Sequence, residues 1–156
     1  MRILVLSDSH GMKKGMEEAV LKFNPNIFIH LGDYSSDCVY LQSVFPGIEV
    51  RSVRGNCDMT GDAPVTDEFV MGGKRFFMSH GHIYKVKLGL DEIIDNALVR
   101  KADVLLFGHT HVPMLQVVNR MLVINPGSAA YSRGTCAVLD MEKGEVHGRI
   151  MSIENI

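Results

Sequence analysis

The sequence predicts an α/β fold in which two mixed β-sheets pack face to face. Short apolar runs alternate with amphipathic helical segments in the first third of the chain, and hairpin patterns dominate the rest. Together these patterns give more strands than one small open sheet holds, which favours two packed sheets. Because no linker, repeat or low-complexity segment interrupts the 156 residues, we expect a single domain over residues 1–156.

The first third of the chain has the order strand, helix, strand, helix, strand. Apolar runs short enough for buried strands lie at 2–7, 26–31 and 49–54. An apolar stripe at helical spacing is formed by Met12, Met16, Ala19, Val20 and Phe23. A weaker helix is expected from Ser36 to Phe45, because Pro46 and Gly47 stop it. This order implies parallel strands joined by right-handed crossovers.

The rest of the chain is expected to be mainly antiparallel. Hairpin patterns occur at 69–79, 115–125 and 136–150. Further strand-like runs lie at 74–79, 103–108 and 121–126. A helix is expected between Gly89 and Lys101, with a stripe formed by Leu90, Ile93, Ile94 and Ala97.

The composition excludes several classes of protein. Sixteen Lys and Arg against 18 Asp and Glu give a net charge of -2, which argues against a dedicated nucleic-acid or anionic-membrane surface. Three widely spaced cysteines suggest neither a disulfide framework nor a zinc knuckle. No basic and apolar leader precedes the first strand, and no apolar run approaches about 18 residues. We therefore expect a cytoplasmic protein without a signal peptide or membrane span.

Polar residues follow one apolar run after another. The segments are Asp8-Ser9-His10, Gly32-Asp33, Gly55-Asn56-Cys57-Asp58, His80-Gly81-His82, Gly108-His109-Thr110-His111 and Asn125-Pro126-Gly127-Ser128. In α/β sheets the carboxyl ends of the strands share one edge, so these residues can converge on one crevice. Five of the seven histidines lie in these segments.

Each segment taken alone also has a simple structural interpretation. Asp8 fits an Asx turn, as do Asn56 and Asp58, and Asp33 fits a helix N-cap. His30 is expected in the core or behind the site, and His147 on the surface. For His109 and His111 a ligand role is favoured, because Gly108 ends the preceding strand and lets both rings turn inward.

Taken together, the segments predict a metal site. They supply carboxylates, imidazoles and one amide oxygen, more ligands than a single ion requires, which favours two ions. This mixture suits Mn²⁺ first, with Ni²⁺, Fe, Zn²⁺, Co²⁺ or Mg²⁺ as other candidates. A carboxylate that bridges two ions roughly 3.5–4 Å apart could hold a hydroxide between them for in-line displacement at phosphorus.

The ordered motifs Asp-x-His, Gly-Asp, Gly-Asn-Cys-Asp, His-Gly-His and Gly-His-Thr-His resemble those of the calcineurin-like metallophosphoesterase superfamily. More narrowly, the chain resembles its small single-domain phosphodiesterases of the YfcE type, from Asp8 to the turn at 125–128. The resemblance implies a four-layer αββα sandwich with a dinuclear metal centre at one edge. It implies that one ion is held by Asp8, His10, Asp33 and His111, and the other by Asp33, Asn56, His80 and His109, with Asp33 as the bridge.

Cys57 departs from the wider superfamily, in which a histidine follows the asparagine, contacts phosphate and protonates the leaving oxygen. A thiol with a pKa near ~8.5 is a poor proton donor to a leaving group at neutral pH. His82 is the candidate replacement donor, and Asp58 is expected to orient a ligand or donor. Gly127 and Ser128 are expected in the pocket wall.

The predicted function is hydrolysis of a small phosphodiester. Candidate contacts to the rest of the substrate are Tyr84, Lys85, Lys87 and Arg133. The alternatives are a phosphomonoesterase, a nuclease, or a non-catalytic scaffold of the same fold that binds protein partners, like the retromer subunit. Exposed edge strands of such a sandwich also fit a homodimer or homotetramer.

Overall fold

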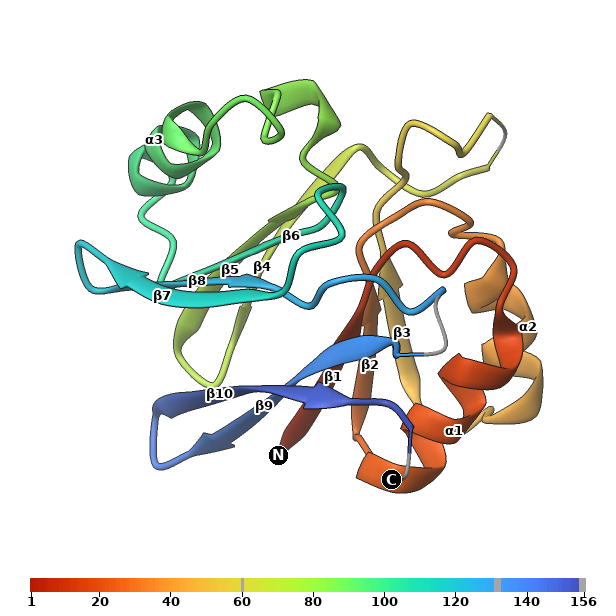
Figure 1. The fold of residues 1–156 in the computed structure, drawn as a ribbon. Helices are drawn as coiled ribbons and strands as arrows, with labels where there is room; N and C mark the ends of the chain where they lie inside the picture. The colour runs from red at the N-terminus through yellow and green to blue at the C-terminus, as the bar shows by residue number, and fades with distance from the viewer. Residues whose placement is uncertain (60, 131–132, 155–156) are drawn as a thin grey trace.

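The computed structural model describes residues 1–59, 61–130 and 133–154. Its elements are β1 (Arg2–Leu6), α1 (Lys13–Phe23), β2 (Ile27–His30), α2 (Asp37–Val44), β3 (Glu49–Ser52), β4 (Thr66–Met71), β5 (Lys74–Ser79), η1 (His82–Tyr84), α3 (Asp91–Val99), β6 (Val104–Phe107), β7 (Met114–Val118), β8 (Met121–Asn125), β9 (Thr135–Glu142) and β10 (Glu145–Ser152). They form four layers, helix, sheet, sheet and helix, which confirms the predicted fold class (Figure 1).

The first sheet has the strand order β10-β9-β1-β2-β3. β1, β2 and β3 are parallel, as the first third of the sequence predicted. The last hairpin of the chain, β9 and β10, joins this sheet through antiparallel pairing of β9 with β1. The two ends of the chain therefore complete one sheet.

The second sheet has the order β4-β5-β6-β8-β7. The three central strands, β5, β6 and β8, are parallel, and β4 and β7 pair antiparallel at the edges. The expectation of a mainly antiparallel second half was therefore incomplete. The hairpins form as predicted. However, β6 pairs in parallel with one strand of each hairpin, β5 and β8, and local turn signals do not reveal such pairings.

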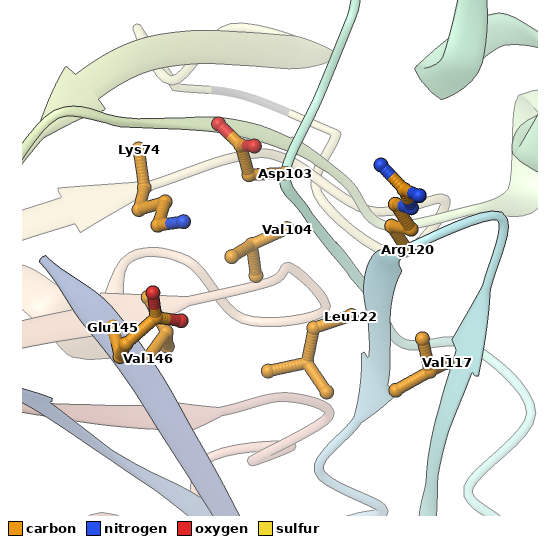
Figure 2. Close-up of a pocket in the computed structure, with 8 residues that line it drawn as sticks. All are labelled: Lys74, Asp103, Val104, Val117, Arg120, Leu122, Glu145 and Val146. Atoms are coloured by element: carbon orange, nitrogen blue, oxygen red, sulfur yellow. The ribbon is translucent and has the colours of Figure 1, made fainter.

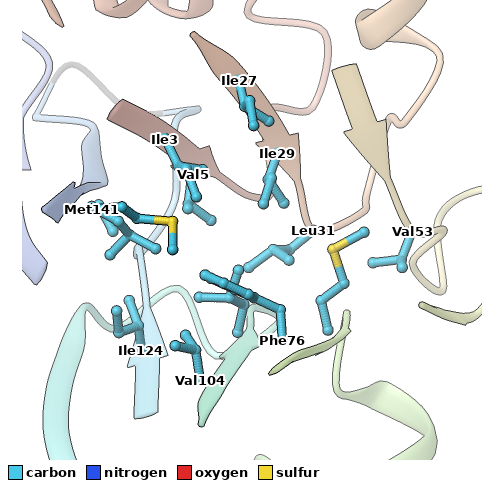
Figure 3. Close-up of a cluster of buried hydrophobic side chains, with 14 residues drawn as sticks. Ile3, Val5, Ile27, Ile29, Leu31, Val53, Phe76, Val104, Ile124 and Met141 are labelled. Atoms are coloured by element: carbon cyan, nitrogen blue, oxygen red, sulfur yellow. The ribbon is translucent and has the colours of Figure 1, made fainter. Parts of the chain in front are cut away.

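Three apolar layers hold the sandwich together. The layer between the sheets includes Val5, Ile29 and Phe76, which are labelled in Figure 3. Leu106 belongs to the same layer. A second layer packs α1 and α2 against the first sheet, and a third packs α3 against the second sheet. The predicted stripe of α1 is buried except for Met12, which precedes the helix in a non-helical conformation and is half exposed.

Among the described residues, none of the helices has the length and apolar character needed to cross a membrane.

The layer between the sheets predicts the cost of a core truncation. Leu106→Ala removes a side chain with no exposed surface, and we expect it to lower the free energy of unfolding by roughly 2–5 kcal/mol. Leu88→Ala is the matched control, because Leu88 is 87% exposed. Urea denaturation of both variants measures the difference, and equal losses would contradict the packing described above.

Candidate metal centre

Five loops from both sheets meet at one edge of the sandwich. They follow β1, β2 and β3 in the first sheet and β5 and β6 in the second. His80 Nδ1 lies 2.8 Å from the carbonyl oxygen of Leu31, and the His109 N–H donates to Asp8 Oδ2 at 3.1 Å. These contacts join loops from different sheets. All seven predicted metal ligands lie at this edge, in the clusters described next.

One cluster of potential ligands contains Asp8, His10 and His111, whose ligand atoms all lie within 4.8 Å of one another. His111 Nε2 is 3.1 Å from Asp8 Oδ1, and His10 Nε2 is 4.0 Å from the same oxygen. The other oxygen of Asp8 accepts hydrogen bonds from the Ser7 hydroxyl and the His109 N–H. Asp8 therefore directs its Oδ1 toward the two imidazoles.

A second cluster contains Asp33, His80 and His109. His80 Nε2 lies 3.4 Å from Asp33 Oδ1 and 3.1 Å from His109 Nδ1. The amide oxygen of Asn56 lies 3.1 Å from the same His80 nitrogen. These four residues are the ligands that the resemblance assigned to one ion.

Asp33 links the two clusters. Its Oδ1 faces His80, while its Oδ2 lies 3.9 Å from His10 Nε2. The ligand atoms of His10, Asp33 and Cys57 form a third group within 4.8 Å of one another. The carboxylate thus has one oxygen on each side, which is the arrangement of a bridging ligand.

The residues at this edge fit divalent metal ions. His10 Nε2 is buried and has no hydrogen-bond partner among the described residues, although buried polar atoms are rarely left unpaired. Ligand atoms about 2.0–2.2 Å from an ion lie about 3–4 Å from one another. The distances from His10 Nε2 to the Asp8 and Asp33 oxygens are in this range.

The ligand loops have strained backbones. Positive φ angles occur at Asp8 (54°), His10 (45°), Asp33 (57°), His109 (68°) and His111 (61°). Left-handed conformations of non-glycine residues cost free energy and cluster at functional sites. The Asp33 φ also rules out a simple N-cap role, and the cap of α2 is Ser36.

Two glycines let the loops after β2 and β3 touch. A Cβ on Gly55 would lie 2.1 Å from Asp33 Oδ1, and a Cβ on Gly32 would lie 2.6 Å from the Gly55 nitrogen. Asp58 closes the same contact, because its carboxylate accepts from the N–H groups of Asp33, Ser35 and Gly55. Asp58 therefore positions Asp33, which is the kind of role predicted for it.

The protonation of the site follows from its burial and charges. Burial raises the pKa of Asp33, but hydrogen bonds from His80 and the Cys57 N–H outweigh it and hold that pKa below its usual value. For His80, burial lowers the pKa, but the Asp33 hydrogen bond and the charges of Asp8 and Asp33 raise it overall. Burial, followed by the charge of His80, lowers the pKa of His109 to about 4. A neutral His109 is the form that binds a metal.

Cys57 and His82 lie beside these ligands. Burial and the neighbouring Asp33 carboxylate raise the pKa of the Cys57 thiol, so it is protonated at neutral pH. The ring of His82 lies 5.4 Å from that of His80 and 6.2 Å from that of His109. Its Nδ1 is buried, with no hydrogen-bond partner among the described residues.

The residues predicted for the pocket wall and for substrate contacts lie in different environments. Ser128 donates from its hydroxyl to the Asp8 carbonyl oxygen at 2.9 Å, and Gly127 N–H donates to Asn125 Oδ1. The expectation that Tyr84 contacts substrate was wrong, because its side chain is buried and its ring packs edge to face against Phe77. The other proposed contacts, Lys85, Lys87 and Arg133, are exposed.

Two residues at the site, Ser7 and Tyr34, were not predicted from the sequence, and Asn125 was predicted only as part of a polar segment. Ser7 donates to Asp8, and Asn125 donates from Nδ2 to the Gly108 carbonyl oxygen and to Thr110 Oγ1. The ring of Tyr34 meets that of His10 edge to face at 5.5 Å. Ser7 and Tyr34 were detectable as polar and aromatic neighbours of the predicted ligands Asp8 and Asp33, whereas the contacts of Asn125 join segments that are distant in the sequence.

A cavity of about 170 Å³ lies at the other end of β5 and β6 (Figure 2). Its polar side chains are Lys74, Asp103, Arg120 and Glu145, around an apolar floor that includes Val104. Its lining contains no imidazole or thiol. Its two positive and two negative side chains balance in formal charge, and its lining lacks the imidazoles found at the opposite edge.

Comparisons with known proteins agree with this site. The sequence family described as calcineurin-like phosphoesterase superfamily domain matches residues 1–144. The probable metallophosphoesterase YsnB of Bacillus subtilis is 33% identical over 138 residues, covering 85% of this chain and 78% of that protein. The phosphodiesterase MJ0936 of Methanocaldococcus jannaschii is 30% identical over 165 residues, covering 93% and 96%.

The fold is also found in proteins with other names. A phosphoesterase-like protein of Streptococcus pneumoniae has a crystal structure with a TM-score of 0.79 and 24% identity, covering 97% of this chain and 89% of that one. The vacuolar protein sorting-associated protein 29 of Schizosaccharomyces pombe is 26% identical over 149 residues, covering 92% and 80%. The fold therefore occurs in proteins named for phosphoesterase activity and for protein sorting.

The close approach at Gly55 predicts the effect of one methyl group on metal binding. Gly55→Ala must displace Asp33, and we expect it to weaken Mn²⁺ binding by roughly 10–100-fold. Gly47→Ala is the matched control, because nothing lies within 4 Å of its added Cβ. Calorimetric titration with Mn²⁺ measures both variants. Unchanged binding by Gly55→Ala would contradict a ligand role for Asp33.

Proposed function

The chain belongs to the calcineurin-like phosphoesterase superfamily, and from this premise we propose that it is a phosphodiesterase with a dinuclear metal centre. The family makes it a metallophosphoesterase, a hydrolase of phosphate esters. The diester as substrate and the pair of ions are the proposal. A cytoplasmic location and a small diester substrate, without nucleic acid, belong to the same proposal.

One observation carries the dinuclear centre. The two oxygens of the Asp33 carboxylate lie toward different imidazoles, at 3.4 Å from His80 Nε2 and 3.9 Å from His10 Nε2. Asp8 and His111 complete the ligand set on the His10 side, and Asn56 and His109 on the His80 side. A single ion would leave about half of these ligands without a role.

Mn²⁺ is the proposed ion at both positions, with Ni²⁺, Fe, Zn²⁺, Co²⁺ and Mg²⁺ as alternatives, because the ligands are nitrogen and oxygen atoms. When bound, two such ions would supply Lewis-acid chemistry: they would activate a water, orient the phosphate and neutralise charge in the transition state. The chain contributes the geometry. Asn56 presents its amide oxygen at the exposed rim, Asp33 bridges, and Asp58 holds Asp33 in place through its N–H.

Cys57 limits the leaving groups. Its raised pKa keeps the thiol neutral, so it offers a phosphate oxygen neither positive charge nor an easily transferred proton. The proposed substrates are therefore diesters whose leaving oxygen needs little protonation. His82 is proposed as the remaining donor, because its Nδ1 is unpartnered among the described residues and its ring lies beside the ligands.

The scaffold alternative is favoured by one finding, the likeness to a vacuolar protein sorting-associated protein. Fold alone does not decide between the two functions. The complete ligand set favours catalysis, since a surface that only binds protein partners does not need seven converging metal ligands.

The proposed function predicts metal-dependent turnover of a generic aryl phosphodiester. After chelation, reloading with Mn²⁺ is expected to restore hydrolysis, with Ni²⁺, Zn²⁺ and Mg²⁺ assayed in parallel. Asp33→Asn removes the bridging charge. Mutation of a residue that only hydrogen-bonds a metal ligand typically lowers activity by roughly 10–100-fold. Because Asp33 is itself a proposed ligand, Asp33→Asn should lower kcat/KM by more than this. Release of the aryl alcohol is followed by absorbance.

Three outcomes would redirect the assignment. Turnover of a phosphomonoester in preference to the diester would make the protein a phosphomonoesterase, and cleavage of single-stranded DNA would make it a nuclease. Absence of turnover with every metal would favour the scaffold.

The role of His82 has its own test. His82→Ala should lower kcat for a diester with an alkyl leaving group by roughly 100-fold, the lower end for a general acid, and leave an aryl leaving group almost unaffected. Metal content is measured in the same samples. An unchanged rate on the alkyl diester, with both metals retained, would remove His82 from the reaction.

A further inference from the structure

A chain of buried polar side chains lies behind the metal-ligand loops, formed by Ser9, His30 and Asp37. Their exposed fractions are 0%, 0% and 2%. Ser9 Oγ is 2.9 Å from His30 Nε2 and 2.8 Å from Asp37 Oδ2. None of the three is a proposed metal ligand, so the reaction described above leaves them without a role.

The directions of the hydrogen bonds follow from the backbone. The Gly32 N–H donates to His30 Nδ1 at 3.2 Å, so the proton of the neutral ring is on Nε2, which donates to Ser9 Oγ. The Ser9 hydroxyl then donates to Asp37 Oδ2, which also accepts from the Gly11 N–H at 3.0 Å. Burial lowers the pKa of His30 to about 4 and keeps the ring neutral.

The two ends of this hydrogen-bonded network lie in two of the loops that carry the predicted metal ligands. Ser9 stands between Asp8 and His10, and Gly11 follows His10. At the other end Gly32 precedes Asp33. Among the described residues, the side-chain hydrogen bonds that Ser9, His30 and Asp37 make outside their own network reach only these loops after β1 and β2.

The loops need such a support. Asp8, His10 and Asp33 all have positive φ angles, and strained residues persist only where the surroundings over-determine them. These three residues are also ligands on the His10 side of the proposed centre. Among the ligands on the other side, only the bridging Asp33 belongs to the two loops that these side chains join, while His80 contacts the loop after β2 through the Leu31 carbonyl oxygen.

We propose that Ser9, His30 and Asp37 are positioning residues that hold Asp8, His10 and Asp33 for one of the two metal ions. This inference rests on the proposed dinuclear centre. Loss of the network should weaken the ion on the His10 side selectively and leave the ion on the His80 side bound. A purely structural network would instead affect both ions together with the stability of the fold.

The test is Mn²⁺ binding by the full chain. The wild type is expected to bind two ions and to give the electron paramagnetic resonance signal of a coupled Mn²⁺ pair. Ser9→Ala should weaken one site by roughly 10–100-fold, with the coupled signal replaced by that of an isolated ion. Ser43→Ala is the matched control, because this serine is exposed and, within residues 1–59, 61–130 and 133–154, its hydroxyl bonds only to the Tyr40 carbonyl oxygen.

A second pair of variants covers the case in which Ser9→Ala fails to fold. Asp37→Asn keeps an oxygen that can accept from both Ser9 and Gly11, and should retain both ions. Asp37→Ala removes the acceptor and should lose the same ion as Ser9→Ala. Urea denaturation of the metal-free proteins shows which variants are folded.

The outcomes are distinct. Two tightly bound ions in folded Ser9→Ala or Asp37→Ala overturn the positioning role, as does equal weakening of both sites. A wild type that binds fewer than two ions overturns the dinuclear centre, and the inference with it. Two ions bound by the wild type and one ion bound by Ser9→Ala and Asp37→Ala support both the dinuclear centre and the positioning role.

Discussion

The carboxylate of Asp33 is the group on which the rest of the site depends. It follows β2 of the first sheet, yet it contacts His80, which follows β5 of the second sheet. The apolar layer between the sheets brings these strand ends together. Without that packing the ligands would belong to two separate surfaces, and neither would hold a complete set.

Holding this carboxylate in place is costly for the fold. Asp8 and Asp33 are almost fully buried, and a buried charge is tolerated only with hydrogen bonds or opposite charge around it. Each carboxylate accepts from one backbone N–H group, from His109 to Asp8 and from Cys57 to Asp33, and from side chains beside it. Backbone donors cannot rotate away, so they help to fix the orientations in which both carboxylates face the imidazoles.

The same fold occurs in proteins named as phosphoesterases and as sorting proteins, so the chemistry must lie in the side chains at this edge. Cys57 stands where the motif resemblance implies a histidine in the wider superfamily. Burial and the neighbouring Asp33 carboxylate raise the pKa of the Cys57 thiol, which makes it a weaker acid. The edge is therefore rich in candidate metal ligands and poor in proton donors, and the ring of His82 lies 5.4 Å from that of His80.

The sequence by itself determined the local elements and the ligand types, because both are written in short segments. Apolar periodicity located the strands and helices, and the polar residues after Leu6, Leu31 and Phe107 marked one edge. Only the tertiary structure decided which ligands meet, that β9 pairs with β1, that Tyr84 is buried and that His30 links two loops. These contacts join residues far apart in the chain, and local propensity carries no information about such pairings.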